Sequence, residues 1–276
     1  MEPLLTVSLV ICCQALVYRA VVRPRIVGWG ASAAERRGPL PGDPPVPLPG
    51  RSTRAITIDA RRPEVWSWLI QLGADRGGFF SYCLIEKLMG YGHRGTELFP
   101  RFTDLEVGRV VPGSREGSRP WIEYGFPVLA VEPGRYFVLG DWGTFHLEEL
   151  DGDRTRLVVR TQGQEPSGPV GRIVDSAFLP LHYLMERRML LGFKARAEAG
   201  AGVRLSGVPD VLWLAGMASS GPGTALLALV GTGTAGTVLA VALGTGWLLT
   251  LLLLPPRPAY STAFLVLVAS ALVATF

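Results

Sequence analysis

Residues 53–82, TRAITIDARRPEVWSWLIQLGADRGGFFSY, contain a strand, a tight polar turn and a helix in succession. Ile56 and Ile58 alternate with polar residues at the period of two that is typical of a strand with one buried face. Pro63 stands near the expected helix start, where its missing N–H costs nothing. The following apolar residues recur at helical spacing: Val65, Trp68, Leu69 and Leu72. The segment therefore predicts a β-strand that leads into a core-facing helix.

The residues after this segment predict an antiparallel sheet and one long helix. A second short helix is expected over 81–89 and a loop over 93–103, after which the sheet resumes near Val107. The strand-like runs are 121–124, 128–132, 136–140, 144–149 and 155–161. Short turns join consecutive runs, and such links require antiparallel pairing. Residues 169–199 read as one helix, which Pro180 is expected to kink.

This order of elements resembles the START-like superfamily, which includes polyketide cyclases, lipid-transfer domains and many bacterial proteins of unassigned role. The resemblance covers roughly residues 30–203. It implies an α+β helix-grip fold, in which a curved antiparallel sheet surrounds a long C-terminal helix and leaves a cavity between sheet and helix. Members range from ligand carriers to enzymes, so the resemblance specifies a fold more closely than a function.

Apolar segments at both ends predict transmembrane helices. The mean hydropathy of +0.29 and the hydrophobic content of 48% are high for a soluble chain. Residues 3–22, 235–254 and 260–276 are each about long enough to span a bilayer, for which a helix needs roughly 20 residues. The alternative is burial in a protein core, but a core helix seldom runs apolar on every face. Residues 206–234 are interrupted by Gly221-Pro222-Gly223, so they form either a broken span or an interfacial helix and a loop. We prefer a span there, which gives four in total.

Three arginines, Arg19, Arg23 and Arg25, end the N-terminal apolar segment, whereas Glu2 precedes it. A cleaved signal peptide has the opposite order, so the segment reads as an uncleaved anchor. The positive-inside rule then places the N-terminus outside and the central domain in the cytoplasm of a multi-pass cell-membrane protein. The expected divisions are an anchor over 1–25, a Pro- and Gly-rich linker over 26–52, the START-like domain over 53–203 and a transmembrane region over 204–276.

The charge and the cysteines favour membrane topology over nucleic-acid binding or a disulfide framework. The formal net charge is +4, but the arginines are scattered and do not form a basic run with aromatic residues. Cys12 and Cys13 lie in the anchor and Cys83 stands alone in the domain, which fits a reducing cytoplasm. The expected partners are a lipid bilayer and a small hydrophobic molecule, with no nucleic acid and no protein partner that the sequence identifies.

Aromatic residues are available to line the cavity that the resemblance implies. Each of them also fits an ordinary core, because large aromatic residues dominate protein interiors. His182 and Arg187 on the long helix could orient the carboxylate or hydroxyl of a ligand, and a solvated helix flank is the alternative for both. The candidate cavity residues are Trp68, Leu72, Phe80, Tyr82, Trp121, Tyr124, Trp142, Phe145, Phe178, His182 and Arg187.

Sequence motifs for catalysis are missing. The histidines His93, His146 and His182 do not stand at metal-ligand spacings. Residues 231–236, GTGTAG, lack the Lys-Ser/Thr ending of a phosphate-binding loop, and the chain contains no G-x-S-x-G elbow. We therefore expect no metal and no cofactor, and we assign no catalytic residue.

Three functions are compatible with these features. We favour a membrane-tethered binding module for a small hydrophobic ligand, such as a lipid, a polyketide or an isoprenoid-like molecule. The second is a cyclase or aromatase type of enzyme that acts on such a ligand through Tyr82, His182 or Arg187. The third is a regulatory or scaffolding membrane protein without a ligand, whose interior is filled by its own side chains.

Overall fold

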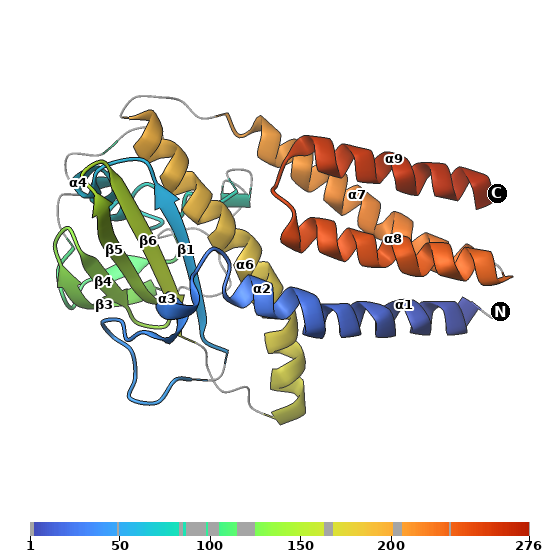
Figure 1. The fold of residues 1–276 in the computed structure, drawn as a ribbon, viewed down its shortest axis with the longest axis horizontal. Helices are drawn as coiled ribbons and strands as arrows, with labels where there is room; N and C mark the ends of the chain where they lie inside the picture. Colours follow the sequence, from blue (N-terminus) through green and yellow to red (C-terminus); the bar gives the residue numbers. More distant parts are fainter. Residues whose placement is uncertain are drawn as a thin grey trace. The chain divides into compact units, whose positions relative to one another are not determined.

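The structure is a computed structural model that describes residues 3–48, 50–82, 85–86, 98, 105–114, 125–162, 168–200, 206–231 and 233–275. For residues 169, 170 and 172–177 only the backbone is described. The chain forms two compact units. Residues 27–205 make up an α+β unit, and residues 1–26 together with 206–276 make up a helical unit (Figure 1).

The α+β unit contains a six-stranded antiparallel sheet in the order β1-β6-β5-β4-β3-β2. The first strand of the unit therefore lies beside the last one, as Figure 1 shows for the blue β1 and the green β6. The antiparallel pairing confirms the prediction from the short turns. The strands are β1 (Ser52–Ile58), β2 (Val110–Pro112), β3 (Gly125–Glu132), β4 (Tyr136–Leu139), β5 (Gly143–Asp151) and β6 (Arg154–Thr161).

The expected strands over 136–140, 144–149 and 155–161 match β4, β5 and β6 to within two residues. Strand β3 begins at Gly125, three residues before the predicted start. Residues 85–86 are helical, but the rest of the expected helix beyond Tyr82 lies outside the described residues. The same holds for the strand over 121–124 and for the loop over 93–103 apart from Leu98.

Two helices, α4 (Arg62–Leu69) and α6 (Gly168–Ala199), contact each other, and both contact strands of the sheet. Helix α4 begins with Pro63 in its first turn, as predicted, and the Glu64 carboxylate accepts a hydrogen bond from the Arg61 N–H at 3.1 Å. Helix α6 contains Pro180, and Figure 1 shows it bent between its yellow first part and its gold remainder. A proline lacks the N–H for the helical ladder and crowds the preceding turn, so a bend is expected there.

The core of this unit lies between the two helices and one face of the sheet, which we call the inner face. On β6, Leu157 and Val159 point into this core, while Arg156 and Arg160 point to the outer face, as the period of two requires. Helix α4 adds Val65, Trp68 and Leu69, and helix α6 adds Met189, Leu190 and Phe193. The inner face and the helix faces that cover it are thus mainly apolar.

The helical unit contains four helices that are long and apolar enough to cross a membrane. Helices α1 (Pro3–Val17), η1 (Tyr18–Val22, a π-helix) and α2 (Arg23–Val27) run on as one span of 25 residues. The other three are α7 (Val208–Val230), α8 (Gly233–Leu253) and α9 (Pro258–Thr275). This agrees with the preferred number of four. The segment interrupted at Gly221-Pro222-Gly223 is one helix, with Pro222 inside it.

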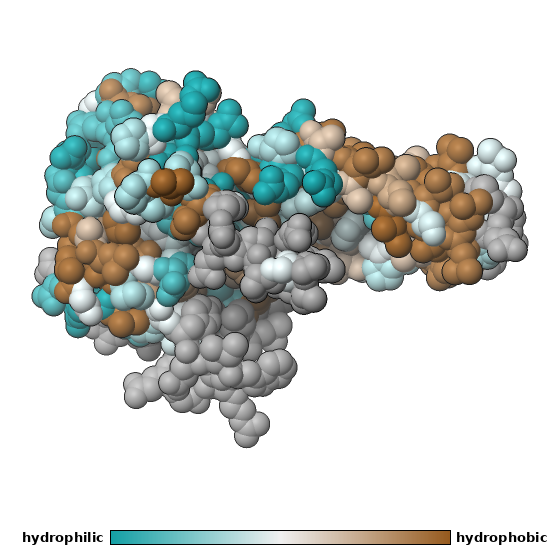
Figure 2. Space-filling view, turned by 90° about the horizontal axis from the view of Figure 1, so that it is seen from below, coloured by the Kyte–Doolittle hydropathy of each residue, from teal (hydrophilic) through white to brown (hydrophobic). Residues whose placement is uncertain are grey.

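Small residues and a few hydrogen bonds hold these four helices together. The Thr6 and Thr237 hydroxyls lie 3.0 Å apart between α1 and α8, and Gln14 Nε2 donates to the Gly244 carbonyl at 2.9 Å. A Cβ at Gly216 would come within 2.7 Å of the Ser261 side chain, so only glycine allows α7 and α9 to approach so closely. Hydrophobic residues such as Leu5, Ile11 and Val266 remain exposed on the outside, and Figure 2 shows the helical unit mostly brown. Both features are typical of helices packed in lipid.

Candidate functional site

A buried ion pair joins the sheet to the long helix at the centre of the α+β unit. Arg54 lies on β1 and Glu186 on α6, and their side chains are 0% and 1% exposed. Arg54 points to the inner face because it alternates with Thr53 and Ala55 in a regular strand. Glu186 points inward because it shares the helix side of Leu190 and Phe193, four and seven residues further on. A charged residue at an inward position of each element therefore creates the pair.

The Glu186 carboxylate is the centre of what we call the inner polar cluster, formed by Arg54, Trp142, Thr161, His182 and Glu186. Its Oε2 pairs with Arg54 Nη1, while its Oε1 accepts hydrogen bonds from Thr161 Oγ1 at 2.9 Å and from Trp142 Nε1 at 3.4 Å. Burial by itself would raise the pKa of Glu186, but the adjacent Arg54 charge and the hydrogen bonds from Thr161 and Arg54 lower it. The carboxylate is thus ionised at neutral pH.

His182 occupies the edge of this cluster and is neutral at pH 7. Its Nδ1 lies 3.5 Å from Arg54 Nη1. Burial lowers the pKa of the imidazole below its ordinary value, and the Arg54 charge acts in the same direction against the opposing effect of Glu186. A neutral imidazole carries one donor and one acceptor nitrogen, so this side chain can serve either kind of polar group.

The His182 ring also belongs to what we call the aromatic row, which is Phe178, His182, Trp142 and Phe126. Phe178 stacks on His182 with ring centroids 5.5 Å apart, His182 meets Trp142 edge-on at 6.5 Å, and Trp142 lies 4.8 Å from Phe126. Phe178 is 57% exposed, whereas Trp142 is buried. The row therefore runs from the surface of α6 into the core and passes directly beside the Glu186 carboxylate.

Tyr183 lies next to the cluster between two arginines. The guanidinium carbons of Arg54 and Arg187 lie 5.2 Å and 5.1 Å from the centre of its ring, and Arg187 Nη1 donates to its hydroxyl at 3.4 Å. Burial raises the pKa of Tyr183, although both arginine charges oppose this. The hydroxyl therefore stays protonated, and the ring keeps both cations over its faces. Tyr183 and Arg187 stand four residues apart and so share one side of α6.

The structure brings most of the candidate cavity residues to the interior of the unit. Arg187 is buried, so the solvated-flank interpretation is wrong for it, and His182 is half-buried. Phe178 does not lie between helix and sheet as expected, because its position on α6 puts it on the side of Leu181 and Met185, away from Tyr183. Trp121 and Tyr124 lie outside the described residues. The candidates that are buried are Trp68, Leu72, Phe80, Tyr82, Trp142 and Phe145.

Three members of the inner polar cluster were not among the candidates: Arg54, Thr161 and Glu186. A signal for two of them is present in the sequence. Arg54 stands at the period of two with Ile56 and Ile58, and Glu186 stands at helical spacing from Leu190 and Phe193. A charged residue on the apolar side of a strand and another on the apolar side of a helix indicate a buried pair between them.

The buried aromatic residues pack against one another. Phe80 lies 6.2 Å from Trp68 and 4.9 Å from Phe193, and Phe145 lies 4.8 Å from Phe137, all measured between ring centroids. Along these contacts the interior is filled by its own side chains. A cleft of about 460 Å³ instead opens on the outer face. It is lined by Glu35, Gly38, Pro39, Leu40, Arg62, Arg135, His146, Leu147, Glu148, Glu149 and Val158.

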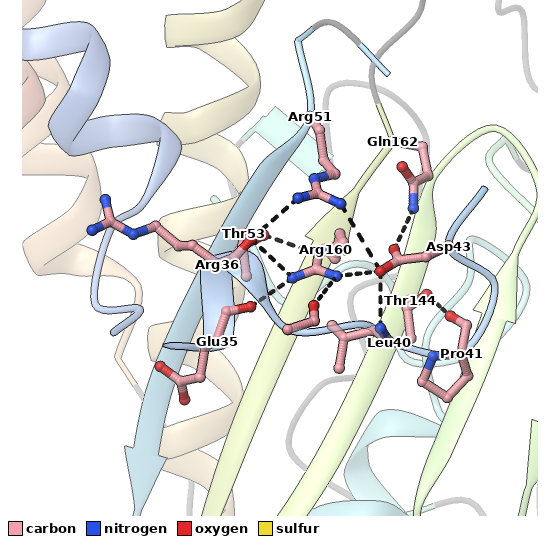
Figure 3. Close-up of polar contacts among 11 residues, drawn as sticks. Glu35, Arg36, Leu40, Pro41, Asp43, Arg51, Thr53, Thr144, Arg160 and Gln162 are labelled. Carbon is pink, nitrogen blue, oxygen red and sulfur yellow. Dashed lines mark hydrogen bonds and ion pairs between the residues drawn. The ribbon is translucent and has the colours of Figure 1, made fainter. Parts of the chain in front are cut away.

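The outer face of the sheet is covered by residues 28–43, which we call the arm, held by a second buried arginine (Figure 3). Arg160 on β6 is fully buried and donates hydrogen bonds to the carbonyls of Gly38 at 2.9 Å and Glu35 at 2.6 Å. It also binds Thr53 Oγ1 at 3.0 Å and forms an ion pair with Asp43. Four residues further back on β6, Arg156 binds the Glu35 carboxylate at 2.7 Å and 3.0 Å.

The arm corrects one expectation. Residues 26–52 were expected to be a linker between the anchor and the domain, but the arm is packed onto the sheet as part of the α+β unit. Gly42 shows how closely it lies, because its φ is +79° and a Cβ there would meet Val138 at 2.6 Å. The prolines of this region stiffen the arm, and the two arginines of β6 supply the donors that bind it.

A tight turn after α4 is a further region of buried polar groups. Glu86 accepts hydrogen bonds from the N–H groups of Ser81 at 2.6 Å and Phe79 at 3.2 Å, and burial raises its pKa against these bonds. Phe80 adopts a left-handed backbone with φ of 56°, which is strained for a bulky residue by roughly 1–3 kcal/mol. Within the described residues, groups of three His, Cys, Asp or Glu side chains placed to hold a metal ion do not occur.

Comparison with known proteins gives little. No family model matches the chain, and no curated protein matches it. The crystal structure of the protein SSP2350 from Staphylococcus saprophyticus is 16% identical, covers 56% of this chain and 97% of its own, and has a TM-score of 0.36. A conserved protein of unknown function, EF2215 from Enterococcus faecalis, is 15% identical over 57% of this chain and 78% of its own, with a TM-score of 0.32. Likenesses this weak carry no argument about fold or function.

Proposed function

We propose that residues 27–205 form a START-like binding module for a small hydrophobic molecule with one polar end, tied to a membrane by the helical unit. The ligand would be a lipid, a polyketide or an isoprenoid-like molecule with a hydroxyl, carbonyl or carboxylate group. The observation that carries the proposal is the aromatic row, which leads from exposed Phe178 to the buried inner polar cluster. Apolar surface and desolvated hydrogen-bonding groups meet there, as in sites for amphipathic small molecules.

The buried ion pair supports a role in recognition better than a role in stability. Taking both charges out of water costs several kcal/mol per ion, and replacing such pairs by apolar residues is often neutral or stabilising. Arg54 and Glu186 are held by side chains that can turn, so a ligand group can take the place of one partner. A hydroxyl or carbonyl would bind Arg54 or His182, and a carboxylate would bind the Arg54 guanidinium.

Entry of the ligand requires that Phe178 and His182 change rotamers. Phe178 is more than half exposed, so its movement meets little steric resistance. Burial of a few hundred Å² of apolar surface at about 25 cal/mol per Å² would then give roughly micromolar affinity after the costs of association. Shape and apolar surface are sufficient for this affinity without any covalent step.

The test uses the full chain purified in a mild detergent. Native mass spectrometry checks for a co-purified small molecule, and fluorescence titration measures binding of cis-parinaric acid and retinol as carboxylate- and hydroxyl-ended probes. We expect Phe178→Ala and His182→Ala to weaken binding of at least one probe by about tenfold, the loss of one aromatic contact or good hydrogen bond. His146→Ala is the matched control. His146 lies on β5 and lines the cleft on the outer face, with its ring 6.4 Å from the Tyr136 ring of β4.

Two outcomes would contradict the proposal. Equal effects of His182→Ala and His146→Ala, or the absence of any binding, would favour a ligand-free scaffold, which the mutual packing of Trp68, Phe80 and Phe193 already fits. Conversion of a bound carbonyl compound that is lost in His182→Ala or Tyr82→Phe would favour the enzyme instead.

We further propose that the α+β unit lies in the cytoplasm and the N-terminus outside. Arg19, Arg23 and Arg25 at the end of the first span support this orientation under the positive-inside rule. Four spans then place Arg257, between α8 and α9, on the cytoplasmic side as well. Labelling of Asp153→Cys by a membrane-impermeant reagent in intact cells would contradict it, since this residue lies in the exposed turn between β5 and β6.

A further inference from the structure

Helix α6 carries an exposed apolar stripe, which consists of Phe178, Leu181 and Met185. These side chains are 57%, 57% and 37% exposed. Their spacing of three and four residues puts them on one side of the helix, while Tyr183 and Arg187 occupy the buried side. Single exposed apolar residues are ordinary, but three neighbours on one helix side form a continuous patch that is characteristic of a docking surface.

The covalent chain limits what can cover this stripe. The Trp29 ring packs edge-on against Tyr183, with centroids 6.5 Å apart. Trp29 follows Val27, the last residue of the N-terminal span, by two positions, which extend over at most about 7 Å. Tyr183 lies between Leu181 and Met185 in sequence. The stripe is on the other side of α6 from Tyr183, so it is separated from Trp29 by the width of one helix, roughly 10–12 Å, and stays within a short chain distance of the end of the first candidate span.

The residues around that point have the composition of a membrane interface. Arg23 and Arg25 stand in the last turns of the span, and Trp29 follows it. Tryptophan is enriched at the level of the lipid headgroups, and long arginine side chains extend there from the ends of spanning helices. A helix side with exposed Phe, Leu and Met side chains that is tethered to such a segment through Trp29 matches an interfacial helix face.

We propose that the stripe of Phe178, Leu181 and Met185 docks into the interfacial layer of the bilayer that the four helices cross. In this arrangement Phe178 is in contact with lipid at one end of the aromatic row. The docking does not require a ligand in the α+β unit, so its test is independent of the proposed binding function.

The test places an environment-sensitive NBD label at Leu181→Cys in the full chain, with Cys12, Cys13 and Cys83 replaced by Ser. The protein is reconstituted into vesicles of phosphatidylcholine and phosphatidylglycerol, with and without lipids that carry a nitroxide quencher at the start of the acyl chain. Leu150→Cys, labelled in the same way, is the control, because Leu150 is 46% exposed at the far end of β5. We expect blue-shifted emission at position 181 and quenching at least about threefold stronger than at position 150, as for a side chain in the headgroup region. Met185→Cys should behave like Leu181→Cys.

Equal quenching at positions 181 and 150 would overturn the proposal. A second copy of the chain is the competing occupant, and it predicts a different result. Dilution of labelled protein with excess unlabelled protein at constant lipid would then change the emission at position 181, while the quencher would have little effect. Docking to lipid predicts the reverse for both measurements.

Discussion

Two buried arginines lie on opposite faces of the same strand pair, and they are bound in different ways. Arg54 of β1 points to the inner face and Arg160 of β6 to the outer face, and both side chains are fully buried. Arg160 is bound largely by backbone carbonyls of the arm, whereas Arg54 is bound by side chains of α6. Backbone acceptors cannot turn away without moving the chain, whereas side chains can change rotamers while the backbone stays in place. The outer cluster therefore holds the arm on the sheet, while the side chains of the inner cluster can change rotamers without moving the chain.

The largest expected effect follows from removing one partner of the buried Arg54–Glu186 ion pair. Glu186→Ala leaves the Arg54 charge buried without its carboxylate, which should lower the free energy of unfolding of the α+β unit by about 3–5 kcal/mol. Hydrogen exchange of the β1 and β6 amides in the full chain measures this loss. The matched variant is the double replacement Arg54→Met with Glu186→Leu, which removes both charges and should restore most of the stability. A double variant as unstable as the single one would show that the pair itself stabilises the unit.

Loss of the outer arginine should have a smaller and more local effect. Arg160→Met removes the donors for the carbonyls of Gly38 and Glu35 and the partner of Asp43, at a cost of about 2–3 kcal/mol. Amide exchange should accelerate most in the arm, and the affinity of the folded protein for cis-parinaric acid should stay within about twofold. If binding falls as far as in His182→Ala, Arg160 does more than hold the arm on the outer face, and the proposed division of roles between the two faces is wrong.

The two faces should also differ at acid pH. The hydrogen bond from Arg156 lowers the pKa of Glu35 from 4.5 to about 2. This contribution to stability is fully present above the ordinary pKa of the unfolded chain and is lost as pH falls from about 4.5 towards 2. It amounts to about 1 kcal/mol, because the pair is partly exposed to water. Limited proteolysis of the arm between these pH values should show its release, and Glu35→Gln should be cleaved already at neutral pH. Identical cleavage of both proteins at all pH values would contradict this account.

The smallest expected change in stability is that of Phe178→Ala, which tests whether Phe178 takes part in binding without contributing to the core. Phe178→Ala should change the free energy of unfolding by less than about 0.5 kcal/mol, because the side chain is largely exposed. The same variant should weaken probe binding by about tenfold if the aromatic row forms the ligand path. Thermal unfolding of the α+β unit and the fluorescence titration are compared on one preparation. A large loss of stability would place Phe178 in the core and contradict the row as a path.

The fold was predictable from sequence where one local pattern determines an element. Ile56 and Ile58 indicated β1, Pro63 indicated the start of α4, and the short turns between the strand-like runs indicated antiparallel strands. Helix α7 was uncertain because Pro222 and its glycines break the local pattern. Neighbouring helices and side chains decide such cases, for instance Thr224, which donates to the Gly221 carbonyl at 2.8 Å.

The candidate site was predicted only in part. Phe178, His182, Trp142 and Arg187 were singled out by type, since aromatic and basic residues on a long helix are obvious choices for a pocket. Glu186 was not among the candidates, although its spacing from Leu190 and Phe193 indicates burial. Periodicity identifies the buried side of one element but not the residue it meets on another, so Arg54 and Glu186 could not be paired from sequence alone.

The sequence by itself determined the apolar helices at both ends, the antiparallel strands and the long helix α6, because these follow from hydrophobic period, charge and turn chemistry over short stretches. Only the tertiary structure decided that β1 pairs with β6, that the arm packs on the outer face and that Arg54 meets Glu186. Each of these contacts joins residues about a hundred positions apart or covers a face that local pattern leaves open. Long-range contacts form only when the whole unit packs, since the cost of closing such loops is offset by many contacts together.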